Sequence, residues 1–484
     1  MKQFLSLFTW SFVCLLYSSS LHAQETFQVN GAPDKRHICY AFTNVRLHVD
    51  YQTIIEKATL VIKDGIITEA GEKAVIPKGA VVYDLKGKSI YPSLIDIYTT
   101  YGMPEVKGEA GRAPQMESNI KGAYGWNQAI KPETDAIELF SADRKAAEEM
   151  RKLGFGSVLS FKKDGIARGS AVFVSLADKN ENELILKDKA AAMYSFDKGT
   201  STQDYPSSLM GTIALLRQTY YDAQWYNQAK GTAEYNISLD AWSKLQSLPQ
   251  IFEVRDKLSA LRADRVGDEF KMQYIIKGSG DEYQRMEEIK ATNARFIIPI
   301  NFPAPYDVED PYDTDMISLE EMKHWEMAPM NPSAFEKNYI QFAITASGRK
   351  DKKDFWKNMQ KAIEYGLSEK QALRSLTMTP AEMAGVKDKV GSLKKGMIAN
   401  FIITSGNLFD EKTIIHENWV QGDQFILKDM NTIDIRANYQ LVIAGGAQER
   451  KYNLKITGEA EKPKAEVSTS DSVKASTEFS LSGK

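Results

Sequence analysis

The chain has 484 residues, of which 43% are hydrophobic and 26% are charged, with a formal net charge of −3. This length suits one large barrel domain with a smaller companion, or two to three ordinary domains, and the composition is typical of a soluble globular protein with a large core. The small net charge gives no electrostatic reason to expect nucleic acid or an anionic membrane surface as a partner.

Residues 1–23 are typical of a cleavable export signal. Lys2 supplies the positive end, residues 4–16 form the apolar core, and Ala23 precedes the expected cleavage point. The apolar run is too short to span a bilayer, and no later segment is apolar enough to do so. We therefore predict a mature protein that is secreted or periplasmic and has no membrane span. Cleavage leaves Cys39 as its only cysteine, so no internal disulfide is expected.

Residues 24–88 are predicted to form the first part of a β-sandwich. Short β-rich runs alternate with tight turns in this segment, and Asp64-Gly65 lies between two of these apolar runs. An Asp-Gly pair in that position is a strong hairpin signal.

Residues 89–388 alternate between strand-like and helix-like segments. We predict strands at 89–99, 156–161, 250–254, 272–276, 295–300 and 339–345, and helices at 142–153, 207–229, 256–270, 281–292 and 352–365. The polar, glycine-rich residues 102–133 are predicted to form a loop over one face. Strands that alternate with helices of this length predict an α/β fold with a parallel sheet, and the number of units is enough for a (β/α)8 barrel of the TIM type.

Residues 389–458 return to short strands, which are expected to join residues 24–88 in one composite β-sandwich. The expected strands lie at 401–404, 419–420, 425–427, 440–443 and 452–456. Residues 459–484 are predicted to be a linker, rich in Lys, Glu and Ser, with a strand-like tail.

Two patches of the sequence resemble one enzyme family. In residues 87–100 a Gly-Lys turn is followed by a Pro-Ser-Leu-Ile-Asp strand. This patch resembles the amidohydrolase pattern of a Gly-Lys turn, a Pro-Gly-Leu/Phe-Ile-Asp strand and a His-x-His pair, with Ser93 in place of the glycine. Residues 379–400 resemble the closing signature of the same family, where the last barrel helix leads into a sandwich strand.

The resemblance covers most of the mature chain and implies both a fold and an activity. Amidohydrolases, among which imidazolonepropionase is the most similar in style, are metal-dependent hydrolases that act on carbon–nitrogen bonds in amides, ureas and cyclic imides. Their one or two divalent ions activate a bound water. Histidines on the first, fifth and sixth barrel strands and an aspartate on the eighth strand hold these ions and complete the family's site.

This sequence departs from the family at each of those positions. Tyr98 and Thr100 fall where the first strand has its His-x-His pair, and Glu253 falls near the fifth-strand histidine. Lys277 falls near the sixth-strand histidine and Ser347 near the eighth-strand aspartate. These five residues are interpreted as degenerate site positions, and no catalytic residue is assigned.

The number of histidines leads to the same interpretation without an alignment. The five histidines are His22, His37, His48, His324 and His416. Only His324 lies in the predicted barrel, on a polar helix-like stretch that is typical of a solvated surface. One histidine cannot build the metal centre of the family, so no metal or other cofactor is predicted.

Carboxylates offer the alternative. Asp96 and Glu253 are both expected near strand ends, and a site built from oxygen ligands would favour Mg²⁺, Ca²⁺ or Mn²⁺ over zinc. The simpler interpretation is that Asp96 makes local hydrogen bonds and that Glu253 pairs with Lys277.

Three functional hypotheses follow. In the first, the protein is catalytically inactive and acts by binding, either to a ligand, to an active amidohydrolase homologue, or as the other half of a longer assembly. That last version resembles the degenerate, metal-less half of double-length family members. In the second, the chain is a working hydrolase of carbon–nitrogen bonds with a carboxylate-based metal site. In the third, it is a structural protein of the cell envelope.

Overall fold

The computed structural model describes residues 38–108, 115–229, 231–348, 354–430, 435–443, 450–459, 462–468 and 474–478. Apart from Ile38, these residues belong to one unit, which runs from Cys39 to Lys484. The predicted export signal at residues 1–23 lies outside them. Within the described residues, no helix has both the length and the apolar character that a membrane crossing requires.

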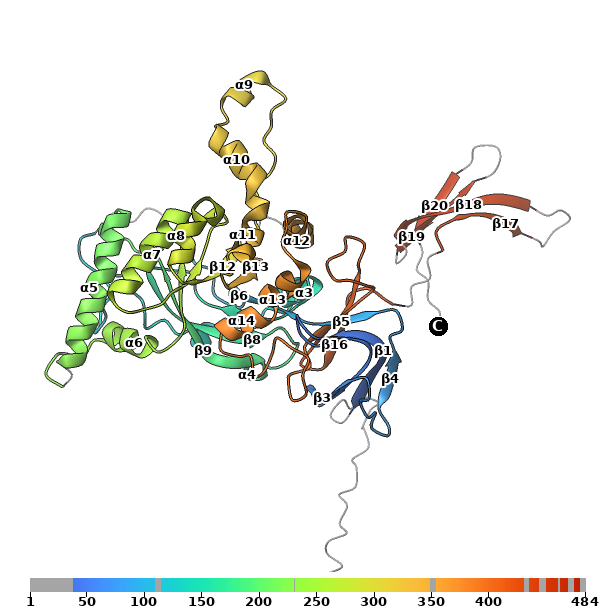
Figure 1. Cartoon of the computed structure of the whole chain (residues 1–484), viewed down its shortest axis with the longest axis horizontal. Helices are drawn as coiled ribbons and strands as arrows, with labels where there is room; N and C mark the ends of the chain where they lie inside the picture. Colours follow the sequence, from blue (N-terminus) through green and yellow to red (C-terminus); the bar gives the residue numbers. More distant parts are fainter. Residues whose placement is uncertain are drawn as a thin grey trace, which may run out of the picture. The chain divides into compact units, whose positions relative to one another are not determined.

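The segments that flank the barrel region in the sequence meet in one eight-stranded sheet (Figure 1). The strand order is β16-β15-β14-β5-β1-β2-β3, with β4 beside β1. β14 pairs antiparallel with β5, which confirms the predicted composite sandwich. The strands are β1 (Cys39–His48), β2 (Ile54–Lys63), β3 (Ile66–Gly71), β4 (Val81–Asp84), β5 (Ser89–Pro92), β14 (Phe401–Thr404), β15 (Ile415–Val420) and β16 (Asp423–Ile426).

Local sequence explains how this sheet turns and what it buries. β2 and β3 form the hairpin predicted at Asp64-Gly65, and both turn residues have positive φ, as the tight turn requires. On the buried face, the Phe42 ring packs edge-on against Phe401 and Trp419, each with a centroid distance of 5.1 Å. Residues from both ends of the barrel region therefore share one apolar core.

Eight strands, hydrogen-bonded in chain order, form the barrel. They are β6 (Leu94–Thr99), β7 (Phe155–Ser160), β8 (Ala167–Ser175), β9 (Ile185–Ser195), β10 (Gln250–Glu253), β11 (Ile275–Lys277), β12 (Arg295–Pro299) and β13 (Phe342–Thr345). One cluster of buried apolar side chains takes residues from all eight strands and fills the interior. The backbone N–H of Ala346, directly after β13, donates a 2.8 Å hydrogen bond to Asp96 on β6. The barrel is therefore nearly closed.

The barrel differs from an all-parallel (β/α)8 barrel at β8. This strand pairs antiparallel with both β7 and β9, whereas the other neighbouring pairs are parallel. The links on both sides of β8 are shorter than the dozen or so residues that a parallel crossover needs, so the chain returns by hairpin-like connections. The sequence predicted neither β8 nor β9; the predicted barrel is confirmed, and its predicted parallel pairing holds for every neighbouring pair except the two that β8 makes.

Helices cover the outside of the barrel (Figure 1). The helices predicted at 142–153, 207–229, 256–270 and 352–365 correspond to α3, α5, α7 and α12, and the helix predicted at 281–292 is divided into η3 and α8. The α-helices are α2 (Ala136–Leu139), α3 (Arg144–Lys152), α4 (Glu181–Leu184), α5 (Leu209–Gln228), α6 (Ile237–Leu245), α7 (Lys257–Glu269), α8 (Met286–Ala291), α9 (Pro311–Asp315), α10 (Leu319–Met327), α11 (Asn331–Lys337), α12 (Asp354–Glu364), α13 (Glu369–Leu376) and α14 (Met378–Met383). The 3₁₀-helices are η3 (Glu282–Arg285) and η4 (Ala328–Met330).

The predicted strand 89–99 is divided at Ser93, where the chain passes from the sandwich into the barrel. The Ser93 hydroxyl donates a 2.8 Å hydrogen bond to the side chain of Asn418 on β15. The Asn418 amide nitrogen in turn donates to the carbonyl oxygens of Arg151 and Phe155. Ser93, which stands where the family pattern has glycine, therefore helps to join the sandwich to the barrel.

The expectations for the C-terminal segment were wrong in two respects. β17 (Asn438–Ile443) and β18 (Arg450–Glu459) do not extend the sandwich but pair with each other in a separate four-stranded sheet. β19 (Lys462–Ser468) lies in the segment predicted as a linker and pairs with β18 and with β20 (Lys474–Glu478). In β19, charged residues alternate with smaller apolar residues. This pattern also suits a strand, in which successive side chains face opposite sides. The strand-like tail expected at 479–484 lies outside the described residues.

Candidate functional site

The barrel mouth, by which we mean the C-terminal ends of its parallel strands, brings the predicted degenerate positions together. Counted along the chain, Tyr98 lies on the first strand, Glu253 ends the fifth and Lys277 ends the sixth. Thr100 directly follows the first strand, and Ser347 lies two residues beyond the eighth. Each residue therefore lies on or just after the strand to which the resemblance assigned it, and the interpretation that these residues replace metal ligands stays a prediction.

A buried arginine that the sequence interpretation missed connects two of these positions. Arg168, on β8, is 3% exposed. Its guanidinium donates a 2.7 Å hydrogen bond to the Glu253 carboxylate and a 3.2 Å hydrogen bond to the Tyr98 hydroxyl. Its Nε atom also donates to the carbonyl oxygen of Gly165. Lys163 completes the group with a 2.7 Å ion pair to the other oxygen of Glu253.

The charges of this group set the protonation of its members. Burial alone would raise the pKa of Glu253, but the positive charges of Arg168 and Lys163 outweigh it and lower that pKa to about 2. Burial raises the pKa of the Tyr98 phenol well above its ordinary value. Glu253 is therefore a carboxylate held by two cations, and Tyr98 remains a neutral phenol.

Lys277 occupies the mouth without an ion pair to any described residue. Its ammonium nitrogen lies 5.4 Å from the centre of the Tyr98 ring, and that of Lys163 lies 5.7 Å from the same centre. Burial lowers the pKa of Lys277; the charge of the nearby Glu253 carboxylate opposes this shift, and the charge of Lys163 adds to it. The expected pairing of Glu253 with Lys277 was wrong, because Arg168 and Lys163 take both carboxylate oxygens.

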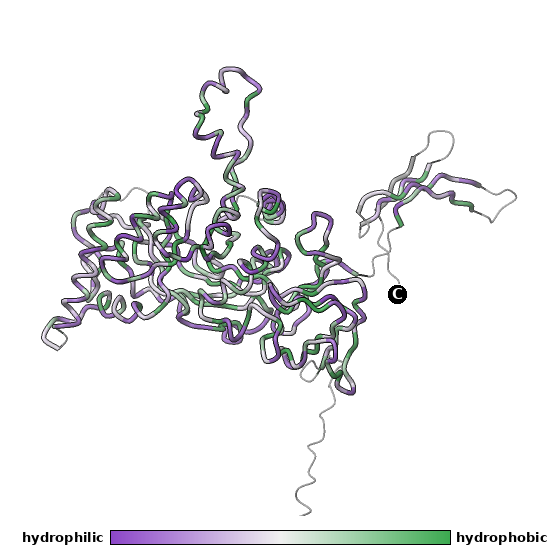
Figure 2. Tube along the Cα trace, in the orientation of Figure 1, coloured by the Kyte–Doolittle hydropathy of each residue, from purple (hydrophilic) through white to green (hydrophobic). Residues whose placement is uncertain are grey.

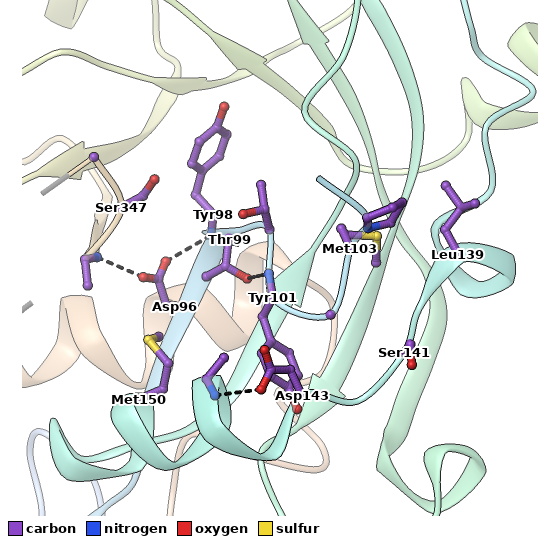
Figure 3. A pocket seen from close by; sticks show the side chains of 16 residues that line it. Asp96, Tyr98, Thr99, Tyr101, Met103, Leu139, Ser141, Asp143, Met150 and Ser347 are labelled. Atoms are coloured by element: carbon purple, nitrogen blue, oxygen red, sulfur yellow. Dashed lines mark hydrogen bonds between the residues drawn. The ribbon is translucent and has the colours of Figure 1, made fainter. Parts of the chain in front are cut away.

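The Asp96 carboxylate is held by hydrogen bonds from the backbone. One of its carboxylate oxygens accepts a 3.0 Å hydrogen bond from the backbone N–H of Tyr98, and the other accepts from Ala346. In Figure 3 the Asp96 carboxylate lies between these two backbone segments, and the Tyr98 ring points away from it. Asp96 therefore helps to close the barrel, in keeping with the local hydrogen bonding expected for it.

The donor set at the mouth does not fit a divalent metal ion. Glu253 is the carboxylate at the fifth-strand position, and two cations already share its oxygens. Lys277 and Arg168 add positive charge within the same group, which would repel a further cation. Among the described residues, no group of three or more His, Cys, Asp or Glu side chains is placed to hold a metal.

The described histidines make their contacts with residues outside the group of Arg168, Lys163, Glu253, Tyr98 and Lys277. His48 stacks on Tyr91 in the sandwich, with 3.8 Å between ring centres, and His416 is on β15. His324 is on α10, where its ring stacks against Tyr283. His22 and His37 lie outside the described residues.

Two cavities adjoin the group of charged residues. One, of about 550 Å³, is lined by Tyr98, Thr100, Ser347 and the side chains shown in Figure 3. The other, of about 590 Å³, is lined by Lys163 and Glu253 together with residues at the beginning of α5 and α7. Their volumes suit a small organic molecule. The mouth therefore keeps space for a ligand where the geometry does not fit a metal ion.

The missed residues had one usable signal in the sequence. Arg168 is the one charged residue in the mostly apolar, β-rich run of residues 166–174. A charged residue within a buried strand needs a counter-charge, so this arginine predicts a carboxylate partner. Its partner could not be named, because Glu253 is 85 residues away in the sequence.

Comparisons with known proteins agree with this architecture. Residues 333–447 match the model of the amidohydrolase family. The solved structure of an amidohydrolase from Thermotoga maritima is similar, with a TM-score of 0.63 and 18% sequence identity, over 80% of this chain and 100% of that one. The fold is thus that of an amidohydrolase, and the matched segment contains the family-like residues 379–400. Together these findings show the fold over most of the chain and a family match that is confined to residues 333–447.

Other solved structures are less similar. A molinate hydrolase is 11% identical with a TM-score of 0.47, over 81% of this chain and 95% of that one. A beta-aspartyl dipeptidase from Fervidobacterium islandicum is 13% identical with a TM-score of 0.43, over 81% of this chain and 97% of that one. A comparison with curated proteins found no match.

Proposed function

We propose that this chain is an amidohydrolase-superfamily protein that has lost the hydrolysis of carbon–nitrogen bonds and acts by binding, as the partner subunit of an active homologue. One observation carries the proposal. At the strand ends where the family holds its ions, Arg168 and Lys163 neutralise Glu253, and Lys277 adds a further cation.

The chemistry of the family explains why this arrangement matters. Hydrolysis requires a water whose pKa is lowered by a bound cation, and it requires donors that are free to hold that cation. In this group the phenol, the carboxylate and the guanidinium satisfy one another by hydrogen bonds. A polar network of this kind is stable as it stands and has no need of an ion.

The proposal also covers the ancestry of the protein and the compartment in which it acts. An imidazolonepropionase-like ancestry and a likeness to the metal-less half of double-length members fit a chain whose barrel has lost its ligands. The signal-like residues 1–23 support a partnership outside the cytoplasm, in the periplasm or the medium.

Metal analysis of the purified full chain tests the proposal. After incubation with Zn²⁺, Mn²⁺ or Mg²⁺ and removal of excess ion, less than about one tenth of an equivalent should remain, because the mouth offers no free donor set. One equivalent or more of metal, lost together with amide, urea or imide hydrolysis on chelation, would contradict the proposal and favour the carboxylate-based hydrolase.

Two matched variants show whether any metal that is found is held by Asp96 and Glu253. If Asp96 and Glu253 formed an oxygen site, Asp96→Asn and Glu253→Gln would each abolish retention of metal. The proposal expects both variants to retain as little metal as the unmodified chain. Copurification with a relative that carries the His-x-His pair tests the partnership. If the chain does not bind this relative, that part of the proposal is contradicted.

A further inference from the structure

Residues 302–327, inserted between β12 and η4, form a projecting segment that we call the acidic arm. It contains α9 and α10, and in Figure 1 these helices extend away from the helices that cover the barrel. The arm begins three residues after Pro299, the C-terminal end of β12. It therefore starts on the side of the barrel where the mouth lies.

Large apolar side chains stand in solvent along the arm. Tyr312 is 82% exposed, Met316 is 84% exposed and Leu319 is 70% exposed. Val308 and Met322 are also exposed. Figure 2 shows hydrophobic residues interspersed with hydrophilic ones along this segment. Single exposed apolar residues are ordinary, but several on one short projection indicate a contact surface.

The base of the arm is held by the body of the protein. The His324 ring lies parallel to the Tyr283 ring, and the Tyr283 hydroxyl is 3.2 Å from His324 Nδ1. The Lys361 ammonium lies 6.0 Å from the centre of the Trp325 ring. The Ser318 hydroxyl and the Glu321 carboxylate cap the start of α10 reciprocally. The arm is therefore a positioned element, which reduces the entropy cost of binding through its tip.

The charge of the arm identifies the chemistry of its partner. Residues 302–327 contain eight Asp and Glu residues and one Lys, a formal charge of −7 with His324 neutral, whereas the whole chain carries −3. A leaflet of anionic lipids would repel this surface despite its apolar side chains. Two arms of two copies would repel each other for the same reason. A protein surface with an apolar pocket edged by Lys and Arg satisfies both features.

We propose that the acidic arm is a docking element for another protein, and that its partner offers an apolar pocket with a basic rim. Tyr312, Met316 and Leu319 fill the pocket, and the carboxylates around them select the partner. Aromatic and long apolar anchors of this kind carry most of the binding energy at interfaces. This inference rests on the proposed function, since it gives the partner subunit its contact surface.

Photo-crosslinking in the cells from which the chain comes identifies the partner. Benzoylphenylalanine is placed at Tyr312 in the full chain and, as a matched control, at Tyr235, which is 63% exposed on another part of the surface. We expect a discrete protein adduct from position 312 that is absent from position 235. Adducts with lipid alone, with a second copy of this chain, or equally from both positions would overturn the proposal.

Direct binding of the purified adduct partner then tests the chemistry. The variant Tyr312→Ser/Met316→Ser/Leu319→Ser should weaken binding at least about tenfold, and Asp313→Asn/Asp315→Asn/Glu320→Gln should weaken it and reduce its salt dependence. The control Val75→Ser/Met210→Ser/Tyr235→Ser, which removes equally exposed side chains elsewhere, should bind within twofold of the unmodified chain.

The outcomes separate this inference from the proposed function. Unchanged affinity in the Tyr312/Met316/Leu319 variant overturns the docking role of the arm, whatever the metal content of the barrel. Metal-dependent hydrolysis overturns the proposed function, whatever the arm binds. Thermal unfolding of each variant confirms that a loss of binding does not arise from a loss of fold.

Discussion

Arg168 and Glu253 form a buried ion pair across the barrel, with 2.7 Å between guanidinium nitrogen and carboxylate oxygen and side-chain exposures of 3% and 15%. Their strands, β8 and β10, are not neighbours, because β9 lies between them. The pair therefore links parts of the barrel that backbone hydrogen bonds do not join directly.

Replacement of Arg168 by Met should destabilise the protein by about 3 kcal/mol, because it leaves a buried carboxylate with only Lys163 as its partner. Urea unfolding measures the change. Arg168→Met/Glu253→Leu should cost less than Arg168→Met alone, since the uncompensated charge is removed. The exposed pair Arg144–Asp178 provides the control, and Arg144→Met should change stability by less than about 0.5 kcal/mol. An equal loss in both single variants would show that burial does not matter at Arg168.

The depressed pKa of Glu253 predicts how stability depends on pH. This pKa is about 2 in the folded protein against an ordinary 4.5, so the carboxylate contributes stability that is complete above about pH 4.5 and is lost as the pH falls towards 2. The contribution is about 3 kcal/mol at neutral pH. Unfolding of the unmodified chain and of Glu253→Gln should therefore converge over this interval. A difference that stayed constant from pH 6 to pH 2 would contradict the ion pairing.

Lys277→Met should be neutral or stabilise the protein by about 1 kcal/mol at pH 7, because it removes a buried cation that has no ion pair among the described residues. The folded pKa of Lys277 lies below 10.5, so the unfolded chain binds its proton more tightly. The unmodified chain should therefore gain stability relative to Lys277→Met as the pH rises towards 10.5. Denaturant unfolding between pH 7 and 10.5 tests this sign. A clear loss of stability in Lys277→Met would indicate a partner for the ammonium.

Gly169, next to Arg168, should not tolerate a side chain. Its φ is +80°, and a Cβ atom would lie 1.9 Å from the carbonyl oxygen of Thr134. Gly169→Ala should therefore cost more than about 3 kcal/mol, or prevent folding. Gly396 has a similar φ of +88° with nothing within 4 Å, so Gly396→Ala should cost only about 1 kcal/mol of backbone strain. Similar losses in the two variants would mean that the backbone at Gly169 relaxes freely.

The sequence was informative where local patterns carry physical meaning. The Asp64-Gly65 turn, the alternation of strands and helices after residue 250, and the return to strands at Phe401 are local features, and each predicted its element. The resemblance then ordered the strands, which is why Glu253 and Lys277 were expected on the fifth and sixth.

The parts that were missed depend on contacts between distant residues. No long helical crossover lies on either side of β8, so its pairing with β7 and β9 has no local signal. The partner of Glu253 was predicted incorrectly because its actual partners lie on the antiparallel strand β8 and in the link before it. Arg168 is on β8, and Lys163 is between β7 and β8. The separate sheet β17–β20 was missed because its strands resemble both sandwich strands and a charged linker.

The cation cluster at the barrel mouth also bears on any attempt to build a metal site into this barrel. Histidine at position 98 would replace the phenol that accepts a hydrogen bond from Arg168, and its ring would lie beside the ammonium groups of Lys163 and Lys277. Because substitutions of residues in contact do not have additive effects, these cations would have to be replaced together with position 98. A single substitution at the mouth therefore does not create a site for a metal ion.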